Sequence, residues 1–197
     1  MPARVKLLLA SSNSGKLREY QALAEGHAIE LALFPRFKSL PAFAESAPTF
    51  AENAAGKALH YSSFAKLPVL ADDSGLVVPA LGGAPGPKSA RYAGPNATDA
   101  DRVRKLLGEL IGRPLNERTA RFICVIAVAR RGRALEVVSD FVEGELIDTP
   151  RGAGGFGYDP IFRYAPLGKT FAELSPEEKN RVSHRGRAFR KLLTVLG

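Results

Sequence analysis

Short apolar runs alternate with polar turns and helix-like segments along the chain. Residues 5–10 are mostly apolar, and a polar turn at 11–15 separates them from a segment with helical spacing at 16–24. This succession predicts a strand, a loop and a helix. Residues 29–34 predict a second strand, and a proline-rich loop at 35–48 follows it.

Capping sequences mark the starts of further helices. Thr49 and Glu52 fit a capping box, in which the hydroxyl and the carboxylate satisfy amides at a helix start. The helix that follows is predicted to reach about residue 65. Thr98 and Ser175 mark two more starts in the same way, the second of them opening the last helix.

Two long β-branched runs predict a hairpin within a mixed sheet. Residues 118–129 and 133–145 are joined by an Arg-Gly pair, which favours an antiparallel turn. Residues 69–72 predict a short buried strand that leaves into a turn at 72–75. Strands that alternate with helices around such a hairpin predict one α/β domain over residues 1–197, with a mixed central sheet flanked by helices.

The composition of the chain argues against a membrane protein. The chain has 45% hydrophobic residues, and its apolar runs fall far short of the roughly 18 residues that a membrane span needs. Residues 1–4 run straight into the first predicted strand without the features of a signal peptide, so we expect a cytoplasmic protein with no membrane partner. The single cysteine, Cys124, has apolar neighbours and predicts a packing role.

The net charge of +8 indicates an anionic partner, which is a nucleic acid, an acidic membrane or a phosphorylated small molecule. The basic residues are spread along the chain, and aromatic residues do not interleave them as in a platform for stacked bases. This pattern disfavours a stable complex with nucleic acid.

The polar turn after the first predicted strand suits a bound phosphate. Small residues, free amides and a lysine precede a helix there: Ser11, Ser12, Asn13, Ser14, Gly15 and Lys16. It is not a Walker loop, because Ala10 and Leu17 stand where that motif requires glycine and serine or threonine. An ordinary polar turn is the alternative.

Two adjacent carboxylates, Asp72 and Asp73, come at the end of the buried strand predicted at 69–72. Oxygen ligands of this kind coordinate divalent cations, and neighbouring like charges need a cation to stay ionised when partly buried. The alternative is a simple turn closed by an aspartate side chain.

Two further segments carry chemistry near the end of the chain. In the glycine-rich stretch at 152–162, Phe156 or Tyr158 offers a ring to a flat base and Asp159 offers a polar contact, unless the aromatic rings belong to the core. Lys179, His184 and Arg185 supply donors near the last predicted helix, where a solvated basic face is the alternative. None of these segments decides the function alone.

Taken together and in order, these segments resemble the inosine/xanthosine triphosphate pyrophosphatase family over nearly the whole chain. The motifs that carry the resemblance are 12–16 (SNSGK), 49–54 (TFAENA), 71–76 (ADDSGL), 82–86 (GGAPG), 89–92 (SARY), 155–160 (GFGYDP) and 183–185 (SHR). The resemblance implies an elongated α/β fold with two lobes around a nucleotide-binding cleft, a homodimer, and Mg²⁺-dependent hydrolysis of XTP, ITP and dITP to monophosphate and pyrophosphate.

The same resemblance implies roles for particular residues. Asp73 is the catalytic acceptor and a metal ligand, with Glu45 and Asp72 as further candidate ligands. The substrate-binding residues are Ser11, Ser12, Asn13, Ser14, Gly15, Lys16, Asn53, Lys57, Ser74, Phe156, Gly157, Tyr158, Asp159, Lys179, His184 and Arg185. One departure concerns Ala47, where the family usually has glycine, and it affects the loop that carries Glu45.

Two other functions remain open from the sequence. A related pyrophosphatase acting on modified pyrimidine triphosphates would share the acidic motif, and a substrate panel would separate it. A non-catalytic nucleic-acid-binding module is favoured only by the positive charge, and the paired aspartates argue against it.

Overall fold

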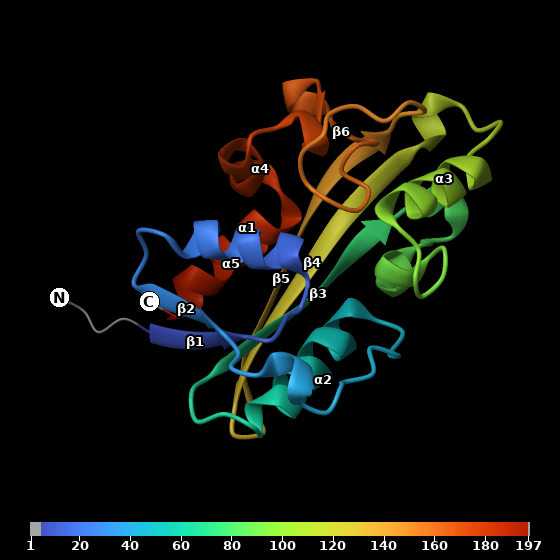
Figure 1. Cartoon of the computed structure of the whole chain (residues 1–197). Helices are drawn as coiled ribbons and strands as arrows, with labels where there is room; N and C mark the ends of the chain where they lie inside the picture. The colour runs from blue at the N-terminus through green and yellow to red at the C-terminus, as the bar shows by residue number, and fades with distance from the viewer. Residues whose placement is uncertain (1–4, 197) are drawn as a thin grey trace. The chain divides into compact units, whose positions relative to one another are not determined.

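The computed structural model describes residues 5–196 and confirms the α/β fold (Figure 1). The expectation that residues 1–4 lack a signal peptide lies outside the described residues. Seven strands form one sheet in the order β2-β1-β3-β4-β5-β6-β7. Pairing is parallel among β1 (Val5–Leu9), β2 (Ile29–Leu33) and β3 (Val69–Val77).

The other part of the sheet is antiparallel, so the sheet is mixed as predicted. It consists of β4 (Thr119–Arg130), β5 (Arg133–Leu146), β6 (Phe162–Tyr164) and β7 (Lys169–Thr170). β6 pairs antiparallel with both β5 and β7. Arg131 and Gly132 connect β4 to β5 with φ of 50° and 74°. A two-residue turn with both φ positive suits the twist of a hairpin, which confirms the predicted one.

The predicted capping residues Thr49, Thr98 and Ser175 each directly precede one of the five α-helices of residues 5–196. The helices are α1 (Ser14–Ala24), α2 (Phe50–Ser62), α3 (Asp99–Glu109), α4 (Pro176–Val182) and α5 (His184–Leu196). The Thr98 and Ser175 side chains each form a complete capping box. α2 ends at Ser62, about three residues earlier than predicted.

The last predicted helix is two helices, because the chain is extended at Ser183, with ψ of 158°. Serine favours this conformation immediately before a helix start. Lys179 therefore lies in α4, whereas His184 and Arg185 open α5.

The prediction of a turn at residues 72–75 is wrong, because β3 continues through them to Val77. Gly75 explains how the strand can continue. A Cβ at this position would come within 2.6 Å of the Gly86 carbonyl oxygen and would collide with the Ser89 hydroxyl. Glycine therefore lets β3 pass close to this backbone, and the two aspartates lie within the strand.

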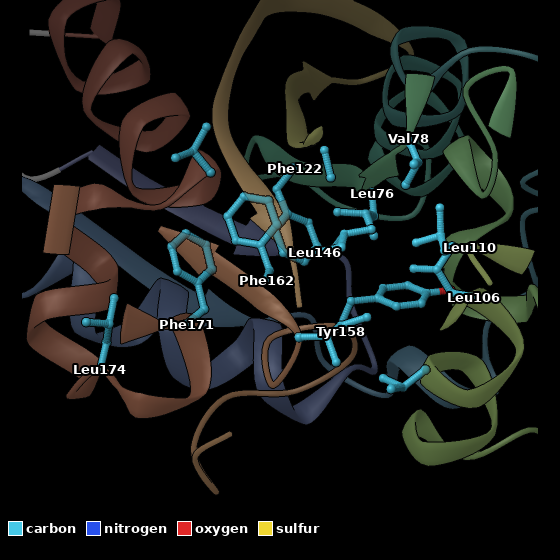
Figure 2. Close-up of a cluster of buried hydrophobic side chains, with 14 residues drawn as sticks. Leu76, Val78, Leu106, Leu110, Phe122, Leu146, Tyr158, Phe162, Phe171 and Leu174 are labelled. Atoms are coloured by element: carbon cyan, nitrogen blue, oxygen red, sulfur yellow. The ribbon is translucent and has the colours of Figure 1, made fainter. Parts of the chain in front are cut away.

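The chain divides into two compact units, each with its own apolar core. The first comprises Met1–Asp73, Cys124–Asp140 and Arg185–Gly197, and the second comprises Ser74–Ile123 and Phe141–His184. In the first unit, Leu9, Tyr20 and Phe189 are buried together. In the second unit, the buried cluster includes Phe122, Phe162 and Phe171, whose rings lie 4.7 to 5.9 Å apart (Figure 2).

None of the helices in the described part of the chain is long and apolar enough to cross a membrane.

Candidate functional site

The predicted phosphate loop connects β1 to the start of α1. Asn13 is the N-cap residue, and its side-chain oxygen accepts a hydrogen bond of 3.0 Å from the Lys16 amide. The Ser11 hydroxyl accepts a hydrogen bond from the Asn13 amide at 3.2 Å. Ser14, Gly15 and Lys16 form the first turn of α1. The loop therefore ends at the positive end of a helix dipole, a position that favours a bound phosphate.

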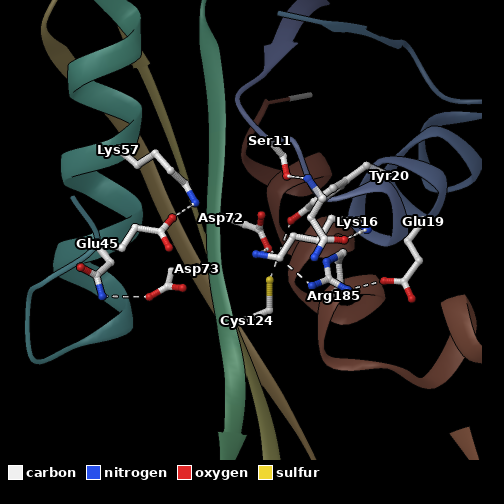
Figure 3. Close-up of polar contacts among 12 residues, drawn as sticks. Ser11, Lys16, Glu19, Tyr20, Glu45, Lys57, Asp72, Asp73, Cys124 and Arg185 are labelled. Carbon is white, nitrogen blue, oxygen red and sulfur yellow. Dashed lines mark hydrogen bonds and ion pairs between the residues drawn. The ribbon is translucent and has the colours of Figure 1, made fainter. Parts of the chain in front are cut away.

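The two aspartates of β3 point to opposite faces of the sheet (Figure 3). Successive side chains alternate along a strand, so neighbours cannot share one face. Asp72 faces α1 and α5, where it meets Lys16 and Arg185. Asp73 faces α2, where it meets Asn53. The two carboxylates read from the sequence as one pair thus have different hydrogen-bond and ion-pair partners on the two faces of one strand.

Asp72 is completely buried and is surrounded by cations. The Lys16 Nζ lies 2.9 Å from its Oδ2, and the Arg185 Nη2 lies 3.5 Å from the same oxygen. Burial by itself would raise the pKa of Asp72, but the charges of Lys16 and Arg185 outweigh it and lower that pKa to about 2. Asp72 therefore stays ionised at any physiological pH.

Arg185 has partners other than Asp72. Its Nη1 forms an ion pair with Glu19 of α1, and its guanidinium lies over the ring of Tyr20, 5.7 Å from the centroid. Only 1% of Arg185 is exposed. A buried arginine with two carboxylate partners is fixed in one orientation, because moving it would strand buried charges.

The pKa of Asp73 is shifted in the opposite direction to that of Asp72. Asn53 donates a hydrogen bond of 3.0 Å to its Oδ2, and Asn53 is itself fixed through both backbone groups of Ala47. Burial raises the pKa of Asp73 to about 6, and the nearby carboxylate of Glu45 adds to the rise although Lys16 and Lys57 oppose it. Asp73 can therefore exchange a proton near neutral pH, as a general base must.

The loop before α2 brings Glu45 to the same face as Asp73 (Figure 3). Glu45 forms an ion pair with Lys57 of α2. Burial would lower the pKa of Lys57, but the charges of Asp72 and Glu45 overcome it and raise that pKa. The loss of glycine at Ala47 has not removed Glu45 from this face, because Ala47 is tied to Asn53 through its amide and carbonyl.

The second unit holds a separate polar group around the glycine-rich loop. The Lys179 Nζ lies 2.5 Å from Asp159 Oδ2, and both side chains are buried. The Phe156 amide donates to the same carboxylate at 2.9 Å, and Lys179 lies over the Phe156 ring, 4.8 Å from its centroid. Gly155 has φ of +69°, and a Cβ there would collide with Asp159. Glycine is thus required for the loop to close around its own carboxylate.

The two candidate aromatic rings of this loop differ in position. Tyr158 is buried in the core of the second unit, and its hydroxyl donates to the Ser89 carbonyl at 3.0 Å. Phe156 is only partly buried. His184 is buried with its ring stacked on Phe122, 4.8 Å between centroids. Of the two aromatic rings in the loop, Phe156 therefore presents the accessible face.

The predicted residues thus fall into one group in each unit. The first unit holds Ser11, Ser12, Asn13, Ser14, Gly15, Lys16, Glu45, Asn53, Lys57, Asp72, Asp73 and Arg185, and the second holds Ser74, Phe156, Gly157, Tyr158, Asp159, Lys179 and His184. Within residues 5–196, no group of three or more histidine, cysteine, aspartate or glutamate side chains forms a metal site. The three predicted metal carboxylates are therefore not clustered, since Asp72 lies on the other face of β3.

Sequence reasoning missed Glu19. Glu19 follows Lys16 by three residues, which places both on one side of a helix that begins at Ser14. The spacing of Lys16 and Glu19 was visible in the sequence, but Arg185, the ion-pair partner of Glu19, lies 166 residues away. Nothing local indicated the pairing.

Comparison with known proteins identifies the chain's relatives. It is 51% identical over 187 residues to the dITP/XTP pyrophosphatase of Geobacillus kaustophilus, covering 95% of this chain and 92% of that protein. The solved HAM1 protein of Coxiella burnetii has a TM-score of 0.87 at 46% identity, covering 98% of both chains. The Staphylococcus aureus Ham1 protein has a TM-score of 0.85 at 37% identity, covering 97% of both. Because the Ham1 family model also matches residues 7–195, the chain belongs to the Ham1 family.

Proposed function

We propose that this protein hydrolyses non-canonical purine nucleoside triphosphates, XTP, ITP and dITP, to the monophosphate and pyrophosphate. The observation that carries the proposal is Asp73, a buried carboxylate whose pKa is raised to about 6 beside cations suited to phosphate. The relative from Geobacillus kaustophilus, named as a dITP/XTP pyrophosphatase, supports the choice of substrate.

We propose that Mg²⁺ binds at the α2-facing side of β3, held by Asp73 and Glu45. The donor set fits this ion, because Mg²⁺ takes one or two carboxylates and keeps several waters. Burial is the main cause of the raised pKa of Asp73 and the charge of Glu45 adds to it, and a bound cation would offset both effects. When bound, Mg²⁺ offsets negative charge on the phosphates. Asp72 supports the site from the opposite face, where Lys16 and Arg185 already balance its charge.

The reaction needs a base and cations for the leaving group. Asp73 accepts a proton from water while the water oxygen bonds to the α-phosphorus. The bond from that phosphorus to the bridging oxygen breaks, and pyrophosphate leaves with the electron pair. Lys16 and Lys57 stabilise the developing charge of the pyrophosphate. Asn53 holds the acceptor oxygen of Asp73 in place.

We propose that the loop of the second unit binds the purine, with Phe156 against the ring face. A 6-oxo purine presents an acceptor where adenine presents an amino donor, so donors from His184, Arg185 or loop amides favour hypoxanthine and xanthine over adenine. Lys179 of α4 is the cation beside this loop, and its ion pair with Asp159 fixes its position.

A pyrophosphate-release assay tests the proposal across ITP, dITP, XTP, ATP, GTP and a set of modified pyrimidine triphosphates, with and without EDTA. We expect fast release from the first three, slow release from ATP and GTP, and no release in EDTA. Equal rates on all purines would refute the base discrimination. A preference for pyrimidines would favour the alternative pyrophosphatase, and activity in EDTA would exclude Mg²⁺ from the reaction.

We further propose that residues 1–197 act as a single catalytic domain, as a homodimer in the cytoplasm, where the nucleotide pool is found. The family resemblance supports the dimer. Light scattering of the purified protein tests it, and a monomeric mass at assay concentrations would contradict it.

A further inference from the structure

The glycine-rich loop is tied to the first turn of α3 by an aspartate that no motif singled out. The Gly157 amide donates a hydrogen bond of 2.7 Å to Asp99 Oδ2. The other carboxylate oxygen of Asp99 forms an ion pair with Arg102, one turn further along α3. Both partners lie in the second unit, 58 residues apart in sequence.

Arg102 in turn fixes Asp99. Its Nη1 donates to the Ala97 carbonyl at 2.6 Å and to the Ala90 carbonyl at 3.0 Å. The guanidinium is therefore held by two backbone oxygens as well as by Asp99, so the carboxylate is presented to Gly157 in a set orientation. A hydrogen bond to a charged acceptor is roughly twice as strong as one between neutral groups.

Gly157 is the part of the loop that needs such an anchor. The neighbouring residues have other hydrogen bonds: the Phe156 amide donates to Asp159 within the loop, and the Tyr158 hydroxyl donates to the Ser89 carbonyl. Gly157 has φ of +65°, and no atom would contact a Cβ there within 4 Å, so side-chain packing does not fix its conformation. The hydrogen bond from the Gly157 amide to Asp99 thus holds the backbone between Phe156 and Tyr158.

We propose that Asp99 is a positioning residue that holds the Gly157 amide and thereby sets the orientation of Phe156 toward the purine. This role rests on the proposed function. Asp99 acts through the loop, and its effect falls on substrate binding and on discrimination between bases. The proton transfer at Asp73 is assigned to different residues in the other unit and should be unaffected.

Asp101 provides a matched control. It is also an aspartate in the first turn of α3, and its side chain is 42% exposed against 45% for Asp99. Asp101 completes the capping box with Thr98 and forms an ion pair with Arg104, so its hydrogen bonds and ion pair lie within its own helix start and not with the loop. A purely helix-stabilising role predicts that Asp101→Ala has at least as large an effect as Asp99→Ala, because both remove a negative charge from the helix start and Asp101→Ala also removes the capping box.

The first measurement is hydrogen exchange of the Gly157 amide by NMR in protein labelled with ¹⁵N-glycine, without substrate. Asp99→Ala should raise the exchange rate about tenfold, in line with loss of a charge-assisted hydrogen bond. Asp99→Asn retains an oxygen acceptor and should recover part of the protection, and Asp101→Ala should leave it unchanged. Unchanged exchange in Asp99→Ala would overturn the proposal.

The second measurement is the kinetics of ITP and ATP hydrolysis by the same variants. Asp99→Ala should raise KM for ITP about tenfold, leave kcat within about threefold, and reduce the preference for ITP over ATP. Asp101→Ala should show none of these changes. Faster exchange with unaltered KM and preference would overturn the role in binding. A wild type inactive on every purine triphosphate would instead refute the proposed function, and the exchange data would still report on the loop contact.

Discussion

Replacing Asp73 with asparagine should abolish activity and stabilise the protein at the same time. Asn keeps the size of the side chain and an oxygen that can accept the hydrogen bond from Asn53. It removes the general base, which alone lowers turnover about 10²- to 10⁴-fold. It also removes a buried negative charge that the folded protein accommodates poorly, as the raised pKa shows.

The size and sign of the stability effect follow from that pKa. The folded state holds the proton of Asp73 up to about pH 6, against an ordinary value of 3.8. Ionisation of Asp73 therefore lowers the free energy of unfolding of the wild type by at most about 3 kcal/mol. This effect is complete above pH 6 and disappears as the pH falls from 6 to 3.8. For a chain of this size this is a ceiling of roughly 6 to 12 °C in melting temperature.

The assay is differential scanning calorimetry of wild type and Asp73→Asn in EDTA, at pH 7.5 and at pH 4, beside pyrophosphate release with Mg²⁺. We expect the variant to melt higher at pH 7.5 and equally at pH 4. A lower melting temperature at pH 7.5, or a difference independent of pH, would refute the electrostatic reasoning. Near-normal turnover would show that Asp73 is not the base.

Asp72→Asn is the matched control on the neighbouring residue, and its sign is opposite. The pKa of Asp72 is lowered to about 2, so its charge stabilises the fold above pH 3.8, and this contribution is lost as the pH falls toward 2. The substitution also weakens the balance of charge around buried Arg185 and Lys16. We expect a lower melting temperature at pH 7.5. Stabilisation by both substitutions would contradict the assignment of the two faces.

Two other pairs of variants test the remaining assignments. Lys16→Ala should raise KM for all triphosphates alike, whereas Arg185→Ala should reduce discrimination between bases. Because the arginine is buried between Glu19 and Asp72, Arg185→Ala should also lower the free energy of unfolding by about 3 to 5 kcal/mol in urea titrations. Identical selectivity profiles for the two variants would refute this division of roles. Gly155→Ala should reduce activity and stability, because the added methyl group would collide with Asp159. Gly157→Ala has room for the methyl group and should cost only about 1 kcal/mol of backbone strain. Equal melting temperatures of the two variants would contradict the predicted collision.

The sequence by itself determined the elements whose causes are local. Capping side chains act within three residues of a helix start, so Thr98 and Ser175 marked their helices correctly. The Arg-Gly pair between two β-branched runs was enough to predict the hairpin of β4 and β5. The order of motifs identified the family because it is a property of the chain alone. The motifs also named Asp73, although neither its pKa nor its partners were visible.

Only the tertiary structure decided which side chains meet across long separations. The sequence read Asp72 and Asp73 as one acidic pair in a turn, but Gly75 fits against the backbone near Ser89, the strand continues, and its alternation sends the two carboxylates to opposite faces. The burial of Tyr158 in the core likewise depended on elements distant in sequence. Glu19 and Asp99 escaped notice because their partners lie 166 and 58 residues away. Such contacts join helices and loops that are distant in sequence, and short sequence patterns do not contain them.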